Sequence, residues 1–130
     1  MRVLIADDRP SLRAAVRALL EHDPECAGID EAETAVDVLA ALQFGADVII
    51  LGWNLRGMPS ETLVRRVREL RSDLIIVALG RFDDTRQVAL DAGADYYIDT
   101  SQPPADFITI LHQLCPQIKT TVARGGAAKG

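Results

Sequence analysis

Two adjacent carboxylates, Asp7 and Asp8, directly follow a short apolar run at the start of the chain. Carboxylate oxygens are suitable ligands for Mg²⁺, whose protein sites usually combine carboxylates with water. An acidic pair at a strand-to-helix junction also has a structural interpretation, because negative charge favours the N-terminus of a helix. The residues leave both roles open, a residual Mg²⁺ site and a stabilising contact at the helix start.

A second stretch that could contribute to a functional site runs from Asp47 to Pro59. Its apolar run, residues 48–51, stops at Gly52, and this pattern predicts a strand that is buried on both faces. In open parallel sheets, ligands bind just outside the carboxyl ends of the strands. The residue at that position is Gly52, which can supply neither a nucleophile nor a metal ligand.

The elements that must position these residues alternate along the chain. Short apolar runs predict five strands, at residues 3–6, 27–31, 47–51, 74–79 and 95–98. Apolar stripes at helical spacing predict five helices, which start near Pro10, Thr34, Ser60, Asp84 and the proline pair at 103–104. Such alternation implies an α/β fold, with a parallel sheet and helices on both of its faces.

The chain length of 130 residues fits one domain. Cys115-Pro116 is predicted to end the last helix, so the domain is expected to span residues 1–116. Glycine-rich residues without periodicity follow, and residues 117–130 are expected to form a disordered tail or a linker.

Composition excludes several classes of function. The net charge of −5 argues against direct binding of nucleic acid, since phosphate contacts need a basic patch. The apolar run after Met1-Arg2 is too short for a signal peptide or a membrane span. Cys26 and Cys115 match no metal spacing and are interpreted as small apolar residues of a reducing cytoplasm. We therefore expect a cytoplasmic protein without membrane contact.

Three motifs, in this order and spacing, resemble the receiver domain of bacterial response regulators, the CheY-like superfamily. They are the Asp7-Asp8 pair, the strand and loop from Val48 to Pro59, and the segment from Ala92 to Ile98. The resemblance implies a flavodoxin-like, doubly wound (βα)5 sandwich with strand order 2-1-3-4-5. It also implies a role in two-component (phosphorelay) signal transduction, with a histidine kinase or an output protein as partner.

The sequence departs from the family pattern at three functional positions. In the family, an aspartate at the end of the third strand accepts a phosphoryl group, and a Thr or Ser and a Lys contact its oxygens. Here the acceptor position falls on Gly52 and the Lys position on Thr100. The Thr/Ser position falls on Ala78, or on Leu79 if the loop is one residue shorter.

Four family positions are retained. The resemblance implies metal ligation by Asp7, Asp8 and the backbone carbonyl of Asn54, and an aromatic switch at Tyr97. In the family this ring moves inward when the Thr/Ser hydroxyl is drawn to the phosphoryl group. With no such hydroxyl here, Tyr97 is expected to pack in one fixed rotamer.

Aspartyl phosphate formation needs a carboxylate nucleophile, and Gly52 offers none. We therefore expect no enzymatic activity, and a phosphorylation-independent pseudo-receiver that acts as a protein–protein interaction or dimerisation module. The expected contact face consists of the fourth helix, fifth strand and fifth helix, with Arg86, Asp95 and His112 among its residues.

An alternative function uses the vacated phosphorylation pocket. A regulator that senses a metal or another small ligand could bind it between Asp7, Asp8, Gly52, Ala78 and Thr100. Phosphorylation of another acceptor, such as Asp8 or Ser60, is disfavoured, because the nucleophile must lie in line with the donor phosphoryl group.

Overall fold

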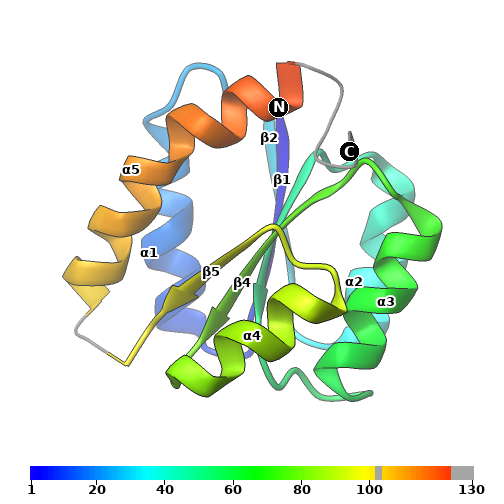
Figure 1. Ribbon diagram of the computed structural model, residues 1–130. Helices are drawn as coiled ribbons and strands as arrows, with labels where there is room; N and C mark the ends of the chain where they lie inside the picture. Colours follow the sequence, from blue (N-terminus) through cyan, green and yellow to red (C-terminus); the bar gives the residue numbers. More distant parts are fainter. Residues whose placement is uncertain (102–103, 124–130) are drawn as a thin grey trace.

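Five parallel strands form one sheet in the order β2-β1-β3-β4-β5, which confirms the predicted fold class and strand order (Figure 1). The computed structural model describes residues 1–101 and 104–123. The strands are β1 (Arg2–Ala6), β2 (Gly28–Ala32), β3 (Val48–Gly52), β4 (Ile75–Gly80) and β5 (Tyr96–Asp99).

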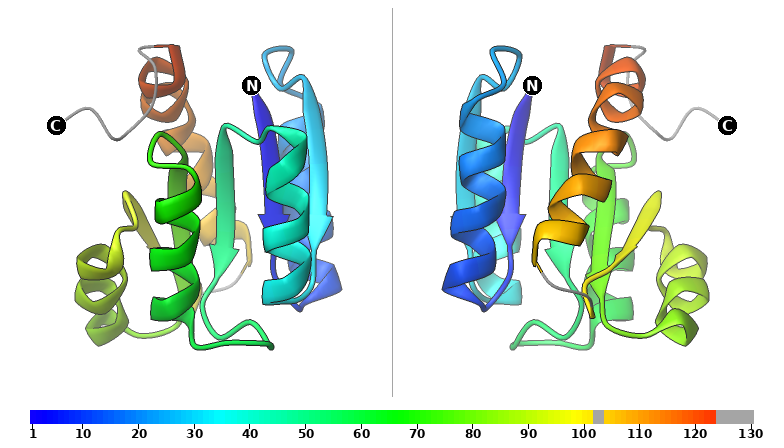
Figure 2. Two further views of the ribbon diagram at one scale, coloured as in Figure 1. Left: turned by 90° about the vertical axis from the view of Figure 1, so that its right-hand side faces the viewer. Right: turned by 90° about the vertical axis from the view of Figure 1, so that its left-hand side faces the viewer.

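Helices cover both faces of the sheet. They are α1 (Pro10–Glu21), α2 (Ala35–Ala41) with the short 3₁₀ helix η1 (Leu42–Phe44), α3 (Ser60–Leu70), α4 (Asp83–Ala92) and α5 (Pro104–Ala123). α1 and α5 lie on one face, and α2, α3 and α4 lie on the other (Figures 1 and 2). Both faces of the central strands are therefore sealed from water.

The burial pattern of the strands explains their sequences. Every residue of β3 and β4 is buried, because helices cover both sides, and a continuous apolar run is the expected signature. Along β3, Ile49 joins the core beneath α2–α4 and Ile50 the core beneath α1 and α5. β2 is the partly exposed edge strand that its acidic residues predict.

Two hydrogen bonds hold the loop between β3 and α3 in place. The N–H of Ala35 donates to the carbonyl of Arg56 at 2.8 Å, which joins the loop to the start of α2. The N–H of Asn54 donates to Ser60 Oγ at 2.6 Å. Ser60 is the first residue of α3, at the predicted helix start, and Pro59 occupies the N-cap position. These contacts hold the loop beside the carboxyl end of β3.

The predicted end of the last helix at Cys115-Pro116 is wrong, because α5 continues to Ala123 with Pro116 inside it. A proline inside a helix removes one backbone hydrogen bond and disfavours the helix locally. Here the apolar stripe continues beyond it: Ile118 is only 3 % exposed, and Val122 packs against the same core. Burial of this stripe stabilises the helix past the proline.

An ion pair also secures the extended part of α5. Lys119 Nζ lies 2.7 Å from Asp23 Oδ2 and 3.4 Å from Glu25 Oε1, in the turn that follows α1. The hydrogen bond to Asp23 raises the pKa of Lys119 and lowers that of Asp23. Residues 117–123 thus pack onto the domain, whereas Pro103 and residues 124–130 lie outside the described residues.

Candidate functional site

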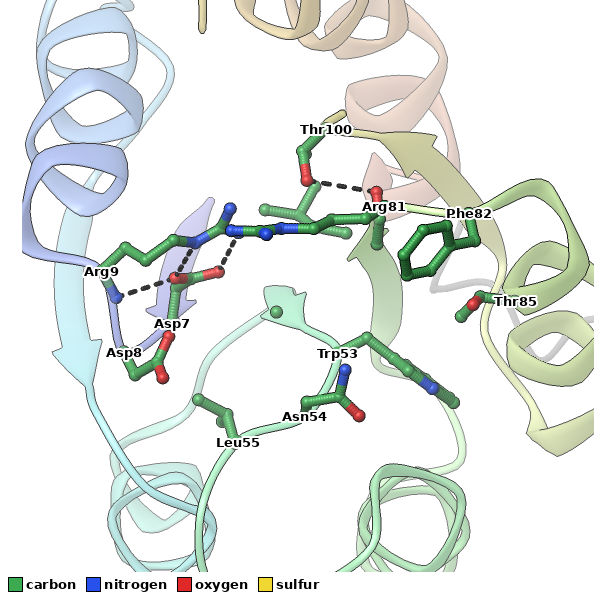
Figure 3. A pocket seen from close by; sticks show the side chains of 13 residues that line it. Asp7, Asp8, Arg9, Trp53, Asn54, Leu55, Arg81, Phe82, Thr85 and Thr100 are labelled. Carbon is green, nitrogen blue, oxygen red and sulfur yellow. Dashed lines mark hydrogen bonds and ion pairs between the residues drawn. The ribbon is translucent and has the colours of Figure 1, made fainter. Parts of the chain in front are cut away.

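A pocket of about 400 Å³ opens at the carboxyl ends of β1, β3 and β4, beside the start of α4 (Figure 3). The structure brings four of the five predicted pocket residues together here, namely Asp7, Asp8, Gly52 and Thr100. The complete lining also includes residues from the loops after β1, β3 and β4, from the end of β4 and from the first turn of α4: Arg9, Trp53, Asn54, Leu55, Leu79, Gly80, Arg81, Phe82 and Thr85.

Asp7 is buried, with 1 % exposure, and an arginine neutralises it from two residues away. Arg9 Nε donates to Asp7 Oδ1 and Arg9 Nη2 donates to Asp7 Oδ2, both at 2.9 Å. The backbone N–H of Arg9 also donates to Oδ1 at 2.9 Å, so the carboxylate stabilises the start of α1 as well. The hydrogen bond to Asp7 raises the pKa of Arg9. Such a bidentate pair satisfies a buried carboxylate without a metal ion.

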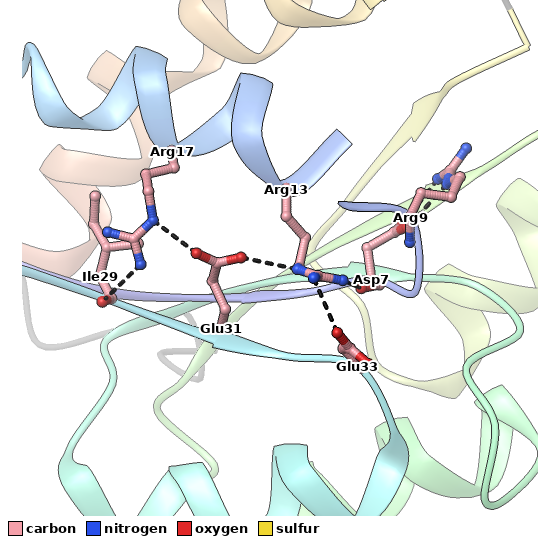
Figure 4. Close-up of polar contacts among 7 residues, drawn as sticks. All are labelled: Asp7, Arg9, Arg13, Arg17, Ile29, Glu31 and Glu33. Atoms are coloured by element: carbon pink, nitrogen blue, oxygen red, sulfur yellow. Dashed lines mark hydrogen bonds and ion pairs between the residues drawn. The ribbon is translucent and has the colours of Figure 1, made fainter. Parts of the chain in front are cut away.

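Two further arginines of α1 extend this pair into a network along β2 (Figure 4). Arg13 Nη1 donates to the carbonyl of Asp7 at 2.7 Å, and Arg13 Nε donates to Glu31 at 2.8 Å. Arg17 Nε donates to the other oxygen of Glu31 at 2.7 Å. The hydrogen bonds from Arg17 and Arg13 lower the pKa of Glu31.

The sequence alone did not identify Arg13 and Arg17 as part of the site. A signal for their role was present, because Arg9, Arg13 and Arg17 follow each other at four-residue spacing. Residues at this spacing share one face of a helix. That face meets the acidic edge strand β2.

Gly52 lies directly beside Asp7. A Cβ atom built on Gly52 would be 2.1 Å from Asp7 Oδ2 and 2.8 Å from Asp7 Cγ. The Asp7 carboxylate therefore occupies the space that a side chain at this position would need. The fold thus favours a glycine at this position, because the Asp7 carboxylate fills the space beside its Cα atom.

The prediction that Ala78 lines the pocket is wrong. Ala78 is fully buried within the core beneath α2–α4 and does not line the pocket. The last residue of β4 is Gly80, and Leu79, the alternative assignment, lines the pocket together with it. The structure thus puts a second glycine, Gly80, at the strand end where sequence reasoning expected a small apolar side chain.

The hydroxyl of Tyr97 fills the space beside Gly80. A Cβ atom at Gly80 would lie 2.2 Å from Tyr97 Oη and 2.8 Å from two ring carbons. Tyr97 is only 6 % exposed, and its hydroxyl donates to the carbonyl of Phe82 at 2.7 Å. Burial raises the pKa of this tyrosine. The guanidinium of Arg86 covers the ring at 5.0 Å from its centroid.

The retained residues do not fit a Mg²⁺ site. Both Asp7 oxygens are taken by Arg9, and Gly52 adds no carboxylate. Asp8 and Asn54 are exposed at the pocket, and Asn54 adopts a left-handed backbone with φ of 80°. Among the described residues, no group of three or more His, Cys, Asp or Glu side chains could hold a metal. A positively charged guanidinium beside Asp7 further disfavours a cation there.

The three residues predicted for the contact face lie in different surroundings. Arg86 of α4 donates to the carbonyl of Tyr97 at 3.2 Å. Asp95 precedes β5 and binds both Arg68 of α3 and the N–H of Ile76, each within 2.9 Å. His112 is exposed on α5, beside a cleft that it shares with residues of α1. Asp95 therefore has a structural role, and the contact face stays a prediction.

A doubly wound parallel sheet with its pocket at the strands' carboxyl ends defines the flavodoxin-like class of α/β proteins. Within that class, the response regulator receiver domain family matches residues 3–112 of this chain. The chain therefore belongs to the response regulator receiver domain family, which functions in two-component signalling.

Relatives in sequence are bacterial regulators. The transcriptional regulatory protein AruR of Pseudomonas aeruginosa is 32 % identical, over 98 % of this chain and 54 % of its own length. The nitrate/nitrite response regulator protein NarL of Escherichia coli is 28 % identical, over 85 % of this chain and 53 % of its own length. The chain thus spans about half the length of these curated relatives.

Solved structures show the same fold. The Salmonella typhimurium response regulator RcsB superimposes with a TM-score of 0.75 at 23 % identity, over 89 % of this chain and 62 % of that chain. A CheY-like receiver domain protein from Methanospirillum hungatei gives 0.73 at 21 % identity, over 92 % of this chain and 96 % of that one. Within residues 1–101 and 104–123, no helix has the length and apolar character needed to cross a membrane.

Proposed function

We propose that this receiver domain works without phosphorylation, as a non-enzymatic interaction module in two-component signalling. The observation that carries the proposal is the pairing of Arg9 with Asp7 beside Gly52. Phosphoryl transfer to a receiver needs a carboxylate nucleophile at the end of the third strand and a metal ion to neutralise the charge that develops. Here the nucleophile position is a glycine, and the carboxylate beside it already has an internal counter-ion.

The position of Tyr97 supports the same proposal. The ring already lies inward, in the space beside Gly80, and its hydroxyl is hydrogen-bonded to Phe82. In the family, the inward ring accompanies the phosphorylated state. A glycine at the end of β4 thus permits the inward ring without a phosphoryl group, and we propose that the domain presents one constant surface to its partners.

The proposed partners are signalling proteins, either a histidine kinase or an output protein, or a second copy of the chain through the α4-β5-α5 face. Val88 on α4 and Ile110 on α5 are apolar residues with 39 % and 41 % exposure that support contacts in this region. AruR is a transcriptional regulatory protein about twice as long as this chain. A role for a longer protein in transcription, and a location in the cytoplasm, are proposed on that analogy.

An amide NMR spectrum with Mg²⁺, followed by addition of beryllofluoride as a phosphoryl mimic, tests the proposal. We expect the spectrum to remain unchanged on both additions, because Arg9 holds Asp7 and Gly52 offers no oxygen. A relative with the acceptor aspartate serves as the positive control. Shifts that spread from Gly52 to Tyr97 on adding the mimic would overturn phosphorylation independence and favour a domain that still senses an anion.

A further inference from the structure

The Arg9–Asp7 pair fills only one side of the pocket. On the other side lie Trp53 after β3, Phe82 after β4 and Thr85 in the first turn of α4. Arg81, also after β4, extends from this side across the pocket towards Arg9, and we call these four residues the aromatic half-pocket (Figure 3). Trp53 is half-buried against the core, whereas Phe82 is 65 % exposed. The ring of Phe82 is thus accessible to a molecule that enters the pocket.

Arg81 is the charged group of this half-pocket. Its side chain extends over the pocket from the β4 side, while that of Arg9 extends from the α1 side (Figure 3). Arg9 is paired with Asp7, but Arg81 is exposed and has no hydrogen-bond or ion-pair partner among the described residues. A guanidinium binds a carboxylate through two parallel hydrogen bonds and also stacks on flat rings.

We propose that the aromatic half-pocket binds a planar aromatic ligand with one anionic group, of the aryl carboxylate class. The ring would contact Trp53 and Phe82, and the anionic group would pair with Arg81. The cavity of about 400 Å³ lies within the range of roughly 300–1,000 Å³ that is typical of small-molecule sites.

Asp8 sets a limit on the charge of this ligand. Its carboxylate lines the pocket on the Arg9 side, away from Phe82 and Thr85 (Figure 3). A second negative charge on the ligand would be repelled by Asp8, because like charges that lie close together destabilise each other. The site therefore favours a monoanion with a ring over inorganic phosphate.

Contact with Phe82 would connect the ligand to the proposed contact region. The carbonyl of Phe82 accepts the hydrogen bond from Tyr97, and the ring of Tyr97 lies beneath Arg86 of α4. A ligand that moves the backbone at Phe82 would change the hydrogen bond of Tyr97. The inference concerns ligand binding and does not depend on whether the domain is phosphorylated.

The test uses Trp53, the single tryptophan of the chain, as its reporter. Its indole N–H gives one NMR resonance, which can be followed during titration with benzoate, salicylate and indole-3-acetate. Inorganic phosphate supplies an anion without a ring, and benzamidine supplies a ring with a cation. We expect saturable shifts with the aryl carboxylates and binding of phosphate and benzamidine weaker by about tenfold or more, the effect of losing one charged hydrogen-bonded pair.

Paired variants separate the site from general surface effects. Arg81→Ala should weaken benzoate binding about tenfold and Phe82→Ala about fivefold. Arg66→Ala and Phe44→Ala, which change an exposed arginine and a phenylalanine of 69 % exposure outside the pocket, should leave it unchanged.

Three results would overturn the inference. The first is the absence of a saturable shift with all three acids up to about 10 mM, a concentration that would fill even a millimolar site. The second is unchanged binding by the Arg81→Ala variant. The third is tighter binding of benzamidine than of benzoate. The beryllofluoride experiment has a separate readout, because a phosphoryl mimic would act at the Gly52 side. Failure of one proposal is therefore distinguishable from failure of the other.

Discussion

Gly52 and Gly80 end neighbouring strands of the sheet, and a side chain from within or directly after another strand fills the space beside each of them. Beside Gly52 the filling group is the Asp7 carboxylate, and beside Gly80 it is the phenol of Tyr97. The first group is charged and needs the guanidinium of Arg9. The second is largely apolar, and its hydroxyl donates a hydrogen bond to the carbonyl of Phe82.

The difference shows that the two sides of the site are stabilised by different interactions. On the Gly52 side a buried charge is kept, so the fold must supply a counter-charge, because an unpaired carboxylate away from water is costly. On the Gly80 side the group that moves in the family rests in a space that a glycine provides. On the first side an arginine pairs with the carboxylate, and on the second side a tyrosine ring lies in the space beside the glycine.

The largest effect is expected from Arg9→Met, which removes the counter-charge but keeps an apolar stem. Asp7 would remain buried and charged without its partner, which should lower the free energy of unfolding by about 3 kcal/mol. This value is at the lower end for buried pairs, because the Arg9 side chain is 33 % exposed. Urea denaturation of both proteins measures the difference.

Arg66→Met, at an exposed arginine outside the pocket, is the matched control and should change stability by less than about 0.5 kcal/mol. Adding Asp7→Asn to Arg9→Met removes the unpaired charge, so the double variant should be more stable than Arg9→Met alone. Equal stability of Arg9→Met and the wild type would mean that Asp7 does not need Arg9.

The two glycines can be compared directly by adding one methyl group to each. Gly80→Ala should cost about 2 kcal/mol, because its Cβ meets the rigid, buried ring of Tyr97. Gly52→Ala should cost about 1 kcal/mol, since it meets the end of the short Asp7 side chain, which can shift together with Arg9. Thermal melts give the order, and a larger loss at Gly52 would reverse the comparison.

The Gly52→Asp variant tests whether a carboxylate at the end of β3 allows the Gly52 side of the site to bind Mg²⁺. Gly52→Asp places like charges side by side and should lower stability without Mg²⁺, with part of the loss, about 1 kcal/mol, recovered when Mg²⁺ is added. Gly52→Asp combined with Arg9→Ala should recover more, because the guanidinium no longer occupies both Asp7 oxygens. If neither variant melts differently with Mg²⁺, the restored carboxylate does not rebuild a metal site.

Much of this fold could be predicted from sequence, because strand periodicity and the order of the motifs depend on local patterns. The strand order 2-1-3-4-5 and the placement of Gly52 near Asp7 and Asp8 were obtained in this way. The predicted site residues differ from the observed ones where the position of a side chain depends on contacts between residues that are distant in the sequence. The exclusion of Ala78 from the pocket depends on where β4 ends beside β5, a property of strand pairing that one sequence does not display.

Two other misses have the same origin. The helix after Pro116 is stabilised by the burial of Ile118, which outweighs the local preference of a proline to end a helix. Asp95 looked like a surface residue in the sequence, but Arg68 of α3 and a backbone N–H of β4 enclose its carboxylate. In each case a tertiary contact determined the role.

The smallest effect is expected at Glu31, where the network that begins at Asp7 ends. Hydrogen bonds from Arg17 and Arg13 hold the pKa of Glu31 below its ordinary value, so the folded state releases this proton more readily than the unfolded state does. Its stabilisation is therefore complete above the ordinary glutamate pKa and is lost as the pH falls through the lowered value. Glu31→Gln should cost about 0.5 kcal/mol at about pH 7, because the side chain is one third exposed, and nothing at about pH 2. Glu61→Gln, whose partner Arg65 lies 4.0 Å away on the exposed face of α3, is the matched control and should change stability by less than about 0.5 kcal/mol at about pH 7. A loss at Glu31 that is the same at both pH values would mean that packing of the side chain, and not its charge, supports the Gly52 side of the site.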